Sequence, residues 1–269
     1  MSLVAGWYDD PSHAGRWRWW DGQVWTTWVR VDQPRLDEQH RFSRPALGRG
    51  WTLLAALAQL GLTLYLLVAG AAFALGWLMF VELGTGQERP RAMDQATIDT
   101  VVTYGDPLVT AGVVVTLATG VVFIAWLFRA HRSNRMSAGR LQRASWWAIG
   151  GWVVPFVNLV MPALVVQDVN RASRPWQQPP GAGLVTCWWV ALVGSSVLGR
   201  LVGEPDTALP MREYLAQVRD AVGLGLVADG LGLVAAVLGI VLVRRLTDQV
   251  RVSPYGPQAS EPATEPTAD

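Results

Sequence analysis

Residues 146–174, with the sequence WWAIGGWVVPFVNLVMPALVVQDVNRASR, decide how this chain is organised. The stretch is apolar enough to enter a bilayer, but Pro155 and Pro162 interrupt it, and Asn158 lies between the two prolines. Since a proline removes a backbone donor and clashes with the preceding turn, no single regular helix is expected to run through it. On either side lies a similar half, each with two apolar runs joined by an acidic loop. The segment therefore marks the passage from one helical hairpin to the next.

The composition indicates an integral membrane protein with a lipid bilayer as its main partner. Of the 269 residues, 51% are hydrophobic and 16% are charged. Four apolar runs are long enough to cross a hydrocarbon core of about 30 Å at about 1.5 Å per residue. They are residues 51–81, 107–128, 183–200 and 221–243. We therefore predict an all-α membrane domain of four transmembrane helices in two hairpins, over residues 51–250.

Local signals predict where two of these spans begin. Asp106-Pro107 offers a favoured N-cap followed by a proline at the first helical position, so we expect the second span to begin there. Apolar residues recur at helical spacing between Pro210 and Val218, which predicts an interfacial helix running into the fourth span.

The arginines decide whether residues 145–173 cross the membrane. From Arg35 onward, a segment that does not cross gives fourteen arginines on one side of the bilayer and five on the other, whereas a crossing segment gives twelve and seven. The positive-inside rule favours the more uneven distribution. We therefore expect a Pro-broken re-entrant or interfacial segment that packs between the hairpins, and both chain termini on the cytoplasmic side.

Within the central segment we predict two short helices. Ser145 would cap the first, Pro155 would break it, and Pro162 would start the second. The second helix is predicted to be amphipathic, with valines on one face and the polar residues, Asp168 among them, on the opposite face.

The N-terminal residues 1–30 are predicted to form a small Trp-rich β-hairpin module. Asp21-Gly22 lies between two aromatic runs, which is typical of a two-residue turn with positive φ at both positions. The candidate binding residues of the module are Trp7, Tyr8, Trp17, Trp19, Trp20 and Trp25. These aromatics either supply the core of a module too short to build one otherwise, or form a groove for a peptide or lipid headgroup.

Two further segments are predicted to lack a packed core. Residues 31–50 are polar and form a linker, while residues 251–269 contain proline, serine, threonine and acids with little to bury. Such a composition predicts a disordered tail.

Several kinds of chemistry are excluded or disfavoured. All 22 basic residues are arginine, which excludes a Schiff-base lysine and the lysine of a P-loop. Cys187 is the single cysteine, and the three histidines are widely scattered, so we expect no metal site and no cofactor. No catalytic constellation is recognisable either, so we predict that the chain is not an enzyme and binds no nucleic acid.

One ionisable residue, Asp229, lies well inside a predicted span. A buried carboxylate is costly in a bilayer, so we expect it to pair with Arg200 at the end of the neighbouring span. The pair would serve either as a structural lock or in proton or ion coupling.

The module resembles a catalogued family. Residues 6–11, GWYDDP, and 18–26, RWWDGQVWT, resemble domain of unknown function 2510 over about residues 5–29. The match departs at Asp9, where that family usually has proline. The resemblance implies a short module that precedes membrane segments in actinobacterial proteins, and it implies no activity.

The central segment resembles a second family. The spacing Trp152-x-x-Pro155-x-x-Asn158 and its continuation to Asp168, after an arginine-rich loop, resemble domain of unknown function 4328 over about residues 51–250. That resemblance implies a multi-span protein of the bacterial plasma membrane and implies no reaction.

Two functions remain open at this stage. The first is a membrane-anchored interaction or regulatory protein that reaches a protein partner through its cytoplasmic Trp-rich module. The alternative is a small-solute or ion transporter or channel component, in which the broken segment and Asn158 line the pathway. The sequence leaves the oligomeric state undecided.

Overall fold

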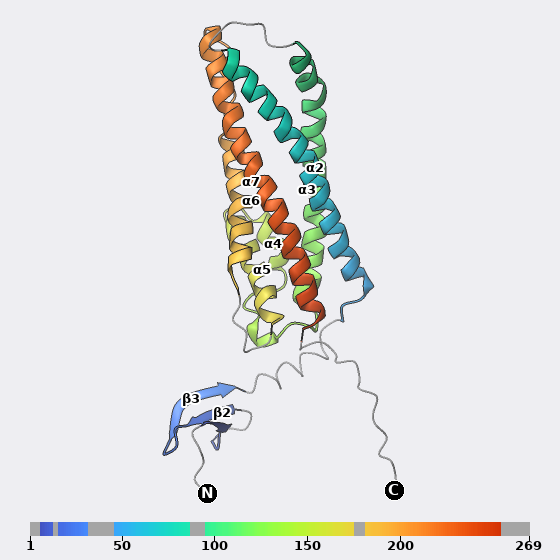
Figure 1. Cartoon of the computed structure of the whole chain (residues 1–269). Helices are drawn as coiled ribbons and strands as arrows, with labels where there is room; N and C mark the ends of the chain where they lie inside the picture. Colours follow the sequence, from blue (N-terminus) through green and yellow to red (C-terminus); the bar gives the residue numbers. More distant parts are fainter. Residues whose placement is uncertain (1–5, 13–15, 32–45, 87–94, 175–180, 254–269) are drawn as a thin grey trace.

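The computed structural model describes residues 6–12, 16–31, 46–86, 95–174 and 181–253. These residues form a small β-sheet followed by a bundle of long helices (Figure 1). Most of the predicted linker and nearly all of the predicted C-terminal tail lie outside the described residues.

The N-terminal sheet has three antiparallel strands in the order β1-β2-β3. They are β1 (Gly6–Asp9), β2 (Arg16–Trp20) and β3 (Trp25–Val31). The pair β2–β3 is the predicted hairpin, and β1 adds a further strand along β2. The prediction of a small β-hairpin module is therefore confirmed.

The turn of the hairpin differs from the predicted one. Trp20 pairs directly with Trp25, so the loop has four residues, 21–24, rather than two. Gly22 has a φ of +101°, whereas Asp21 is not among the residues with positive φ. The Asp21 carboxylate instead accepts hydrogen bonds of 2.7 Å from the amides of Gln23 and Val24, which lower its pKa. This side-chain cap stabilises a longer loop than propensity alone indicates.

Replacing Gly22 by valine is expected to destabilise the module. A β-branched residue is strained at a φ of +101°, and we expect a loss of about 1–2 kcal/mol in the free energy of unfolding. Thermal unfolding of the excised module, followed by indole NMR signals, measures the loss. Gln23→Val is the control, because it places the same side chain in the same exposed loop without positive φ; equal losses would show that strain is not the cause.

Within the described residues, four helices have the length and apolar character needed to cross a membrane. They are α2 (Arg49–Gly86), α3 (Gln95–Arg132), α6 (Gly183–Leu201) and α7 (Met211–Arg251). Each contains one of the predicted spans. The chain is a multi-pass membrane protein of the predicted fold class, with two helical hairpins and a broken segment between them.

Helix α3 begins eleven residues before the expected start at Asp106, so the predicted cap there is wrong. Pro107 lies inside α3. A proline at this place removes one backbone hydrogen bond, and the other turns of this helix of 38 residues still hold it together. At the new start, the Gln95 side chain donates a hydrogen bond of 3.0 Å to the Asp99 carboxylate. By contrast, the helix predicted after Pro210 does run into the fourth span as part of α7.

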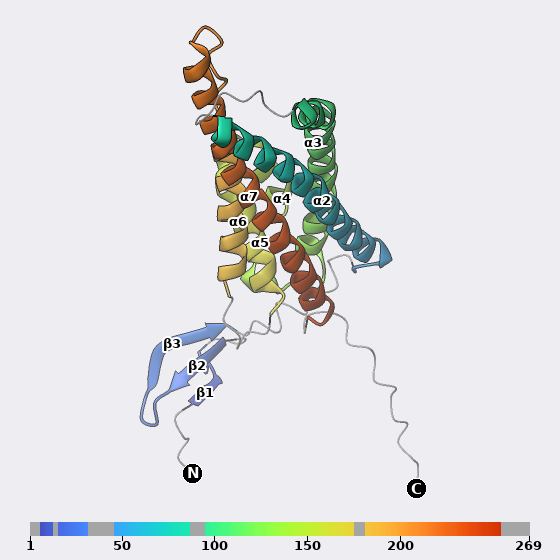
Figure 2. The same ribbon diagram turned by 45° about the horizontal axis from the view of Figure 1, so that its top comes forward.

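The long helices pack so that α2 lies along both α3 and α7, and α6 lies along α7 (Figures 1 and 2). The start of α2, the end of α3, the start of α6 and the end of α7 share one end of the bundle, which we call the arginine end. Since α3 ends at this end and α6 begins there, the central segment, residues 145–173, does not cross the bundle. The predicted non-crossing segment is confirmed.

The central segment consists of α4 (Trp147–Val153), the 3-10 turn η2 (Val157–Leu159) and α5 (Met161–Ala172). The breaks lie at Pro155 and just before Pro162, as predicted. The chain reverses at Phe156, which has a φ of +63°. Ser145 does not cap α4: the N-cap is Trp146, and no side chain bonds the first turn.

Helix α5 is more enclosed than an interfacial helix. Val165 and Val169 are fully buried, as the apolar face predicts, but Asp168 and Asn170 are buried too. The predicted polar face was therefore wrong for these two residues. The reason is long-range packing, because the loop after α3 and the end of α7 cover that side of α5.

Candidate functional site

A partly open cavity of about 240 Å³ lies between the four long helices. Its hydroxyl-bearing lining residues are Tyr65 of α2, Thr116 and Thr119 of α3, and Ser195 and Ser196 of α6. No charged residue is among the described residues that line it. The sequence analysis did not single out this set, although a tyrosine, two threonines and two serines within apolar runs are a signal that could have indicated it.

Glycines make room for these hydroxyl groups. A Cβ atom on Gly232 of α7 would lie 2.8 Å from the Tyr65 hydroxyl oxygen and 3.1 Å from that of Ser195. Only a residue without a side chain lets both groups approach α7 so closely. The two hydroxyls thus meet on one side of the cavity.

Aromatic rings form the other part of the lining, towards the arginine end. The Phe123 ring lies 6.0 Å from Trp152 of α4 and 5.6 Å from Trp188 of α6, measured between centroids. Trp189 packs edge-on against Trp152 at 5.8 Å and donates a hydrogen bond of 2.7 Å to the Leu159 carbonyl. The central segment therefore contributes a wall of the cavity and is fastened to α6.

Trp152 carries a buried indole N–H for which the described residues supply no hydrogen-bond acceptor. The next residues of α3 and α7 towards the arginine end include Trp126, Leu127 and Leu242, which are almost completely buried. The lining of the cavity is thus mainly apolar, with hydroxyl groups among its residues. Its chemistry suits an uncharged molecule that is mainly apolar and carries oxygen atoms.

A second polar centre surrounds Asp168, which is fully buried on α5. Its carboxylate pairs with Arg143 at 2.9 Å and with Arg171 at 3.1 Å. Arg140 reaches the same helix end and donates to the carbonyls of Arg171 and Arg174 at 3.0 and 2.9 Å. Burial raises the pKa of the Asp168 carboxyl, although Arg143 acts in the opposite direction. The centre ties the loop after α3 to α5.

The other polar residue predicted in the central segment lies away from the cavity. Asn158 is exposed at the reversal of the chain, and its backbone N–H donates a hydrogen bond of 3.0 Å to the Val154 carbonyl. Pro155 is also exposed, whereas Pro162 is buried in the first turn of α5. Asn158 is not among the described residues that line the cavity, and its role in a transport pathway stays a prediction.

Arg200 and Asp229 do not form the predicted ion pair. Both residues are exposed, and the described part of the chain contains no salt bridge between them. On α7 the buried face runs through Leu226, Ala228 and Gly232, and Asp229 lies beside this face rather than on it.

In the N-terminal module, the structure describes the side chains of four of the six predicted aromatic binding residues. Tyr8 and Trp20 each pack edge-on against Trp25, with ring centroids 6.2 and 5.1 Å away. Trp19 lies opposite Trp7 in the strand pairing and accepts a hydrogen bond of 2.9 Å at its carbonyl from Thr26. The side chains of Trp7 and Trp17 lie outside the described residues. Trp28 on β3, which was not among the predicted binding residues, is 69% exposed.

Neither centre has the composition of a metal site. Among the described residues, no three His, Cys, Asp or Glu side chains lie close enough to share an ion. Cys187 is exposed on α6.

Comparison with known protein families gives two matches. The family described as "Protein of unknown function (DUF2510)" matches residues 5–38, which include the three-stranded module. The family described as "Domain of unknown function (DUF4328)" matches residues 89–248, from the region of α3 to α7. No curated protein and no solved structure matches the chain significantly.

The larger match begins at residue 89, so α2 lies outside it, whereas the sequence resemblance was placed from about residue 51. The match includes the Asp168 centre and every cavity-lining residue of α3, α4, α6 and α7. Since it covers more than half of the 269 residues, the chain belongs to the family described as Domain of unknown function (DUF4328).

Proposed function

We propose that this protein is a membrane-embedded regulatory binding protein. Its bundle takes an uncharged, largely apolar molecule from the bilayer, and its N-terminal module contacts a protein partner on the cytoplasmic side. The observation that carries the proposal is the central cavity, with its aromatic and hydroxyl lining and no charged residue among its described walls.

The polar groups of the cavity favour binding over catalysis. They are hydroxyls and indole N–H groups, which orient a ligand by hydrogen bonding. No carboxylate or imidazole, the usual general bases, is among the described lining residues. The exposed Trp28 on β3 offers the module an aromatic contact for a partner.

The test is to fill the cavity with a larger side chain and to measure how much apolar compound stays bound to the purified protein. Gly120 lines the cavity, and a Cβ atom there would meet nothing within 4 Å. Gly120→Leu is therefore expected to fold but to reduce the co-purified apolar compound, measured by mass spectrometry of a solvent extract, by about tenfold. The matched control is Gly70→Leu on α2, which also has open space and does not line the cavity. Equal retention in both variants and the wild type would contradict the proposal.

A transporter remains the second candidate, because Trp152 of the broken segment lines the cavity. The two candidates differ in one measurement. Flux of a radiolabelled small solute through proteoliposomes, abolished by Gly120→Leu and kept by Gly70→Leu, would favour transport. A regulatory binding protein is expected to show ligand retention without flux.

The proposed orientation has its own test. In a Cys187→Ala background, Thr207→Cys is expected to react with an impermeant thiol reagent on intact cells, because residues 202–210 join α6 and α7 at the end opposite to the arginine end. Ala144→Cys at the arginine end is expected to react only after permeabilisation. Both positions are exposed, so the reversed labelling pattern would place the arginine end outside.

A further inference from the structure

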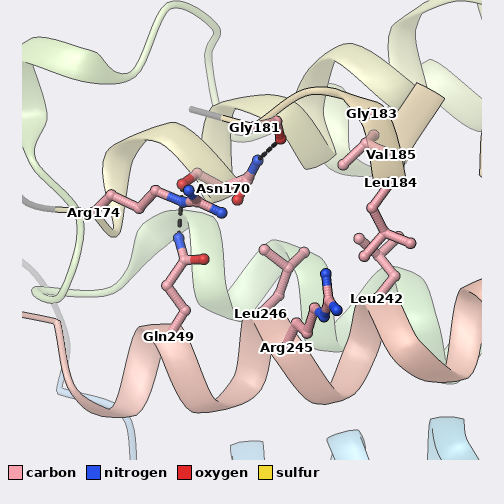
Figure 3. A pocket seen from close by; sticks show the side chains of 10 residues that line it. All are labelled: Asn170, Arg174, Gly181, Gly183, Leu184, Val185, Leu242, Arg245, Leu246 and Gln249. Atoms are coloured by element: carbon pink, nitrogen blue, oxygen red, sulfur yellow. Dashed lines mark hydrogen bonds between the residues drawn. The ribbon is translucent and has the colours of Figure 1, made fainter. Parts of the chain in front are cut away.

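A smaller cavity, of about 140 Å³, lies at the arginine end, where α5 ends, α6 begins and α7 ends (Figure 3). It is separate from the central cavity and shares no lining residue with it. The side chains that matter for its chemistry are those of Asn170, Arg174, Leu184, Arg245, Leu246 and Gln249.

Hydrogen bonds between three elements fix the shape of this cavity. The Asn170 side-chain amide donates to the Gly181 carbonyl at 2.9 Å, which ties α5 to the residues before α6. The Gln249 side-chain amide donates to the Asn170 carbonyl at 2.7 Å and to the Ser173 hydroxyl at 2.6 Å, which ties α7 to α5. The guanidinium group of Arg245 takes part in none of these hydrogen bonds.

The cavity is positively charged. Arg245 and Arg174 both line it, and the described residues offer Arg245 neither a hydrogen bond nor an ion pair. The first residues of α6, whose backbone N–H groups lack a side-chain cap, line it as well. None of its described lining residues is acidic, and the adjoining sequence 175–180, PWQQPP, contains no acid.

The nearest carboxylates on the same elements are already paired. Asp168 of α5 binds Arg143 and Arg171, and Asp248 of α7 lies 3.7 Å from Arg251. No carboxylate is among the described residues that line the cavity with Arg245. Guanidinium groups and helix N-termini are the donors that bind phosphate oxygens in proteins.

We propose that this cavity binds a phosphate group. Figure 3 shows Arg174 and Gln249 on one side, Leu184 and Leu242 on the other, and Arg245 rising from α7 between them. The apolar side lies where α6 enters its span, so a phospholipid headgroup could bind here with its chains along α6. A soluble phosphate compound carries the same group, and the experiment separates the two sources.

The experiment compares two neighbouring arginines of α7 in the full-length protein. Arg245→Gln removes a charge that lines the cavity. Arg244→Gln removes a charge that is also exposed but lies outside the cavity, where its Nε donates a hydrogen bond of 3.2 Å to Gln59 of α2. In the first arm, native mass spectrometry measures binding of phosphatidylglycerol and of phosphatidylcholine with the same chains. In the second arm, thermal shifts measure binding of inorganic phosphate and glycerol 3-phosphate.

Arg245→Gln is expected to weaken phosphate-group binding by about tenfold, and Arg244→Gln by no more than about twofold. An Arg245-dependent preference for phosphatidylglycerol identifies a lipid headgroup, and Arg245-dependent shifts with the soluble phosphates identify a soluble compound. General attraction between a basic surface and anions gives equal losses in both variants, and that result would overturn the proposal. So would the absence of binding in both arms.

Discussion

Asp168→Asn is expected to lower the free energy of unfolding by about 3 kcal/mol, because it leaves two arginines at the arginine end without their carboxylate. Removing one partner of a buried ion pair costs about 3–5 kcal/mol in soluble proteins. The lower end applies here, since Arg143 keeps 20% of its side chain exposed and Arg171 keeps 27%. Unfolding in mixed micelles with increasing SDS measures the loss.

The matched control is Asp248→Asn on α7, at the same end of the bundle. Its carboxylate is 74% exposed and lies 3.7 Å from Arg251, so its loss is expected to cost less than about 0.5 kcal/mol. If both substitutions had the same effect, net charge at this end would be the cause rather than the buried pair.

The double substitution Arg143→Gln with Asp168→Asn separates the value of the pair from the cost of breaking it. Burial raises the pKa of Asp168 even though two arginines lie within 3.1 Å, which indicates that desolvation outweighs their attraction. The double variant is therefore expected to lose less than the sum of the two single losses. Additive losses would mean that the two side chains act independently.

The same residues show what sequence reasoning could reach. Apolar runs predict spans because any crossing helix must satisfy its backbone internally, and Pro155 and Pro162 predict breaks because proline removes a donor locally. The arginine count predicted the non-crossing segment for an equally local reason, since charges adjoining spans remain near the spans. All three predictions agree with the structure.

The errors concern residues whose environment depends on distant parts of the chain. The pattern of α5 identified Asp168 as polar, but its burial depends on Arg143, which lies 25 residues earlier. The Asp106-Pro107 cap failed because a long helix tolerates one lost bond. The ion pair between Asp229 and Arg200 was predicted because Asp229 lies well inside a span. The position along a helix does not specify which way a side chain points around it, and Asp229 is exposed.

The arginines from which the topology is predicted also make structural contacts. Arg140 caps the end of α5, Arg143 neutralises Asp168, and Arg135 donates to the Arg251 carbonyl at the end of α7. This network holds the central segment against both hairpins at the arginine end. The same central segment contributes Trp152 to the aromatic wall of the central cavity.

The other wall of the cavity depends on how closely α2 and α3 approach, and Gly61→Ala is expected to disrupt that approach. A Cβ atom on Gly61 would lie 3.0 Å from the Cβ and Cγ2 atoms of Thr119 and even closer to its hydroxyl oxygen. Since Thr119 is nearly buried and both partners are helical, the helices must separate. We expect a loss of about 2–3 kcal/mol in the SDS unfolding assay.

Two further variants establish the cause. Gly70→Ala makes the same change on α2 where a Cβ meets nothing within 4 Å, and it is expected to be neutral. Thr119→Gly removes every Thr119 atom that the new Cβ would contact, so the double variant Gly61→Ala with Thr119→Gly is expected to recover most of the loss. Because Thr119 lines the cavity, the double variant also alters one of its hydroxyl contacts, and restored stability with reduced ligand retention would connect the helix contact to the site. A double variant no more stable than Gly61→Ala alone would show that the clash lies elsewhere.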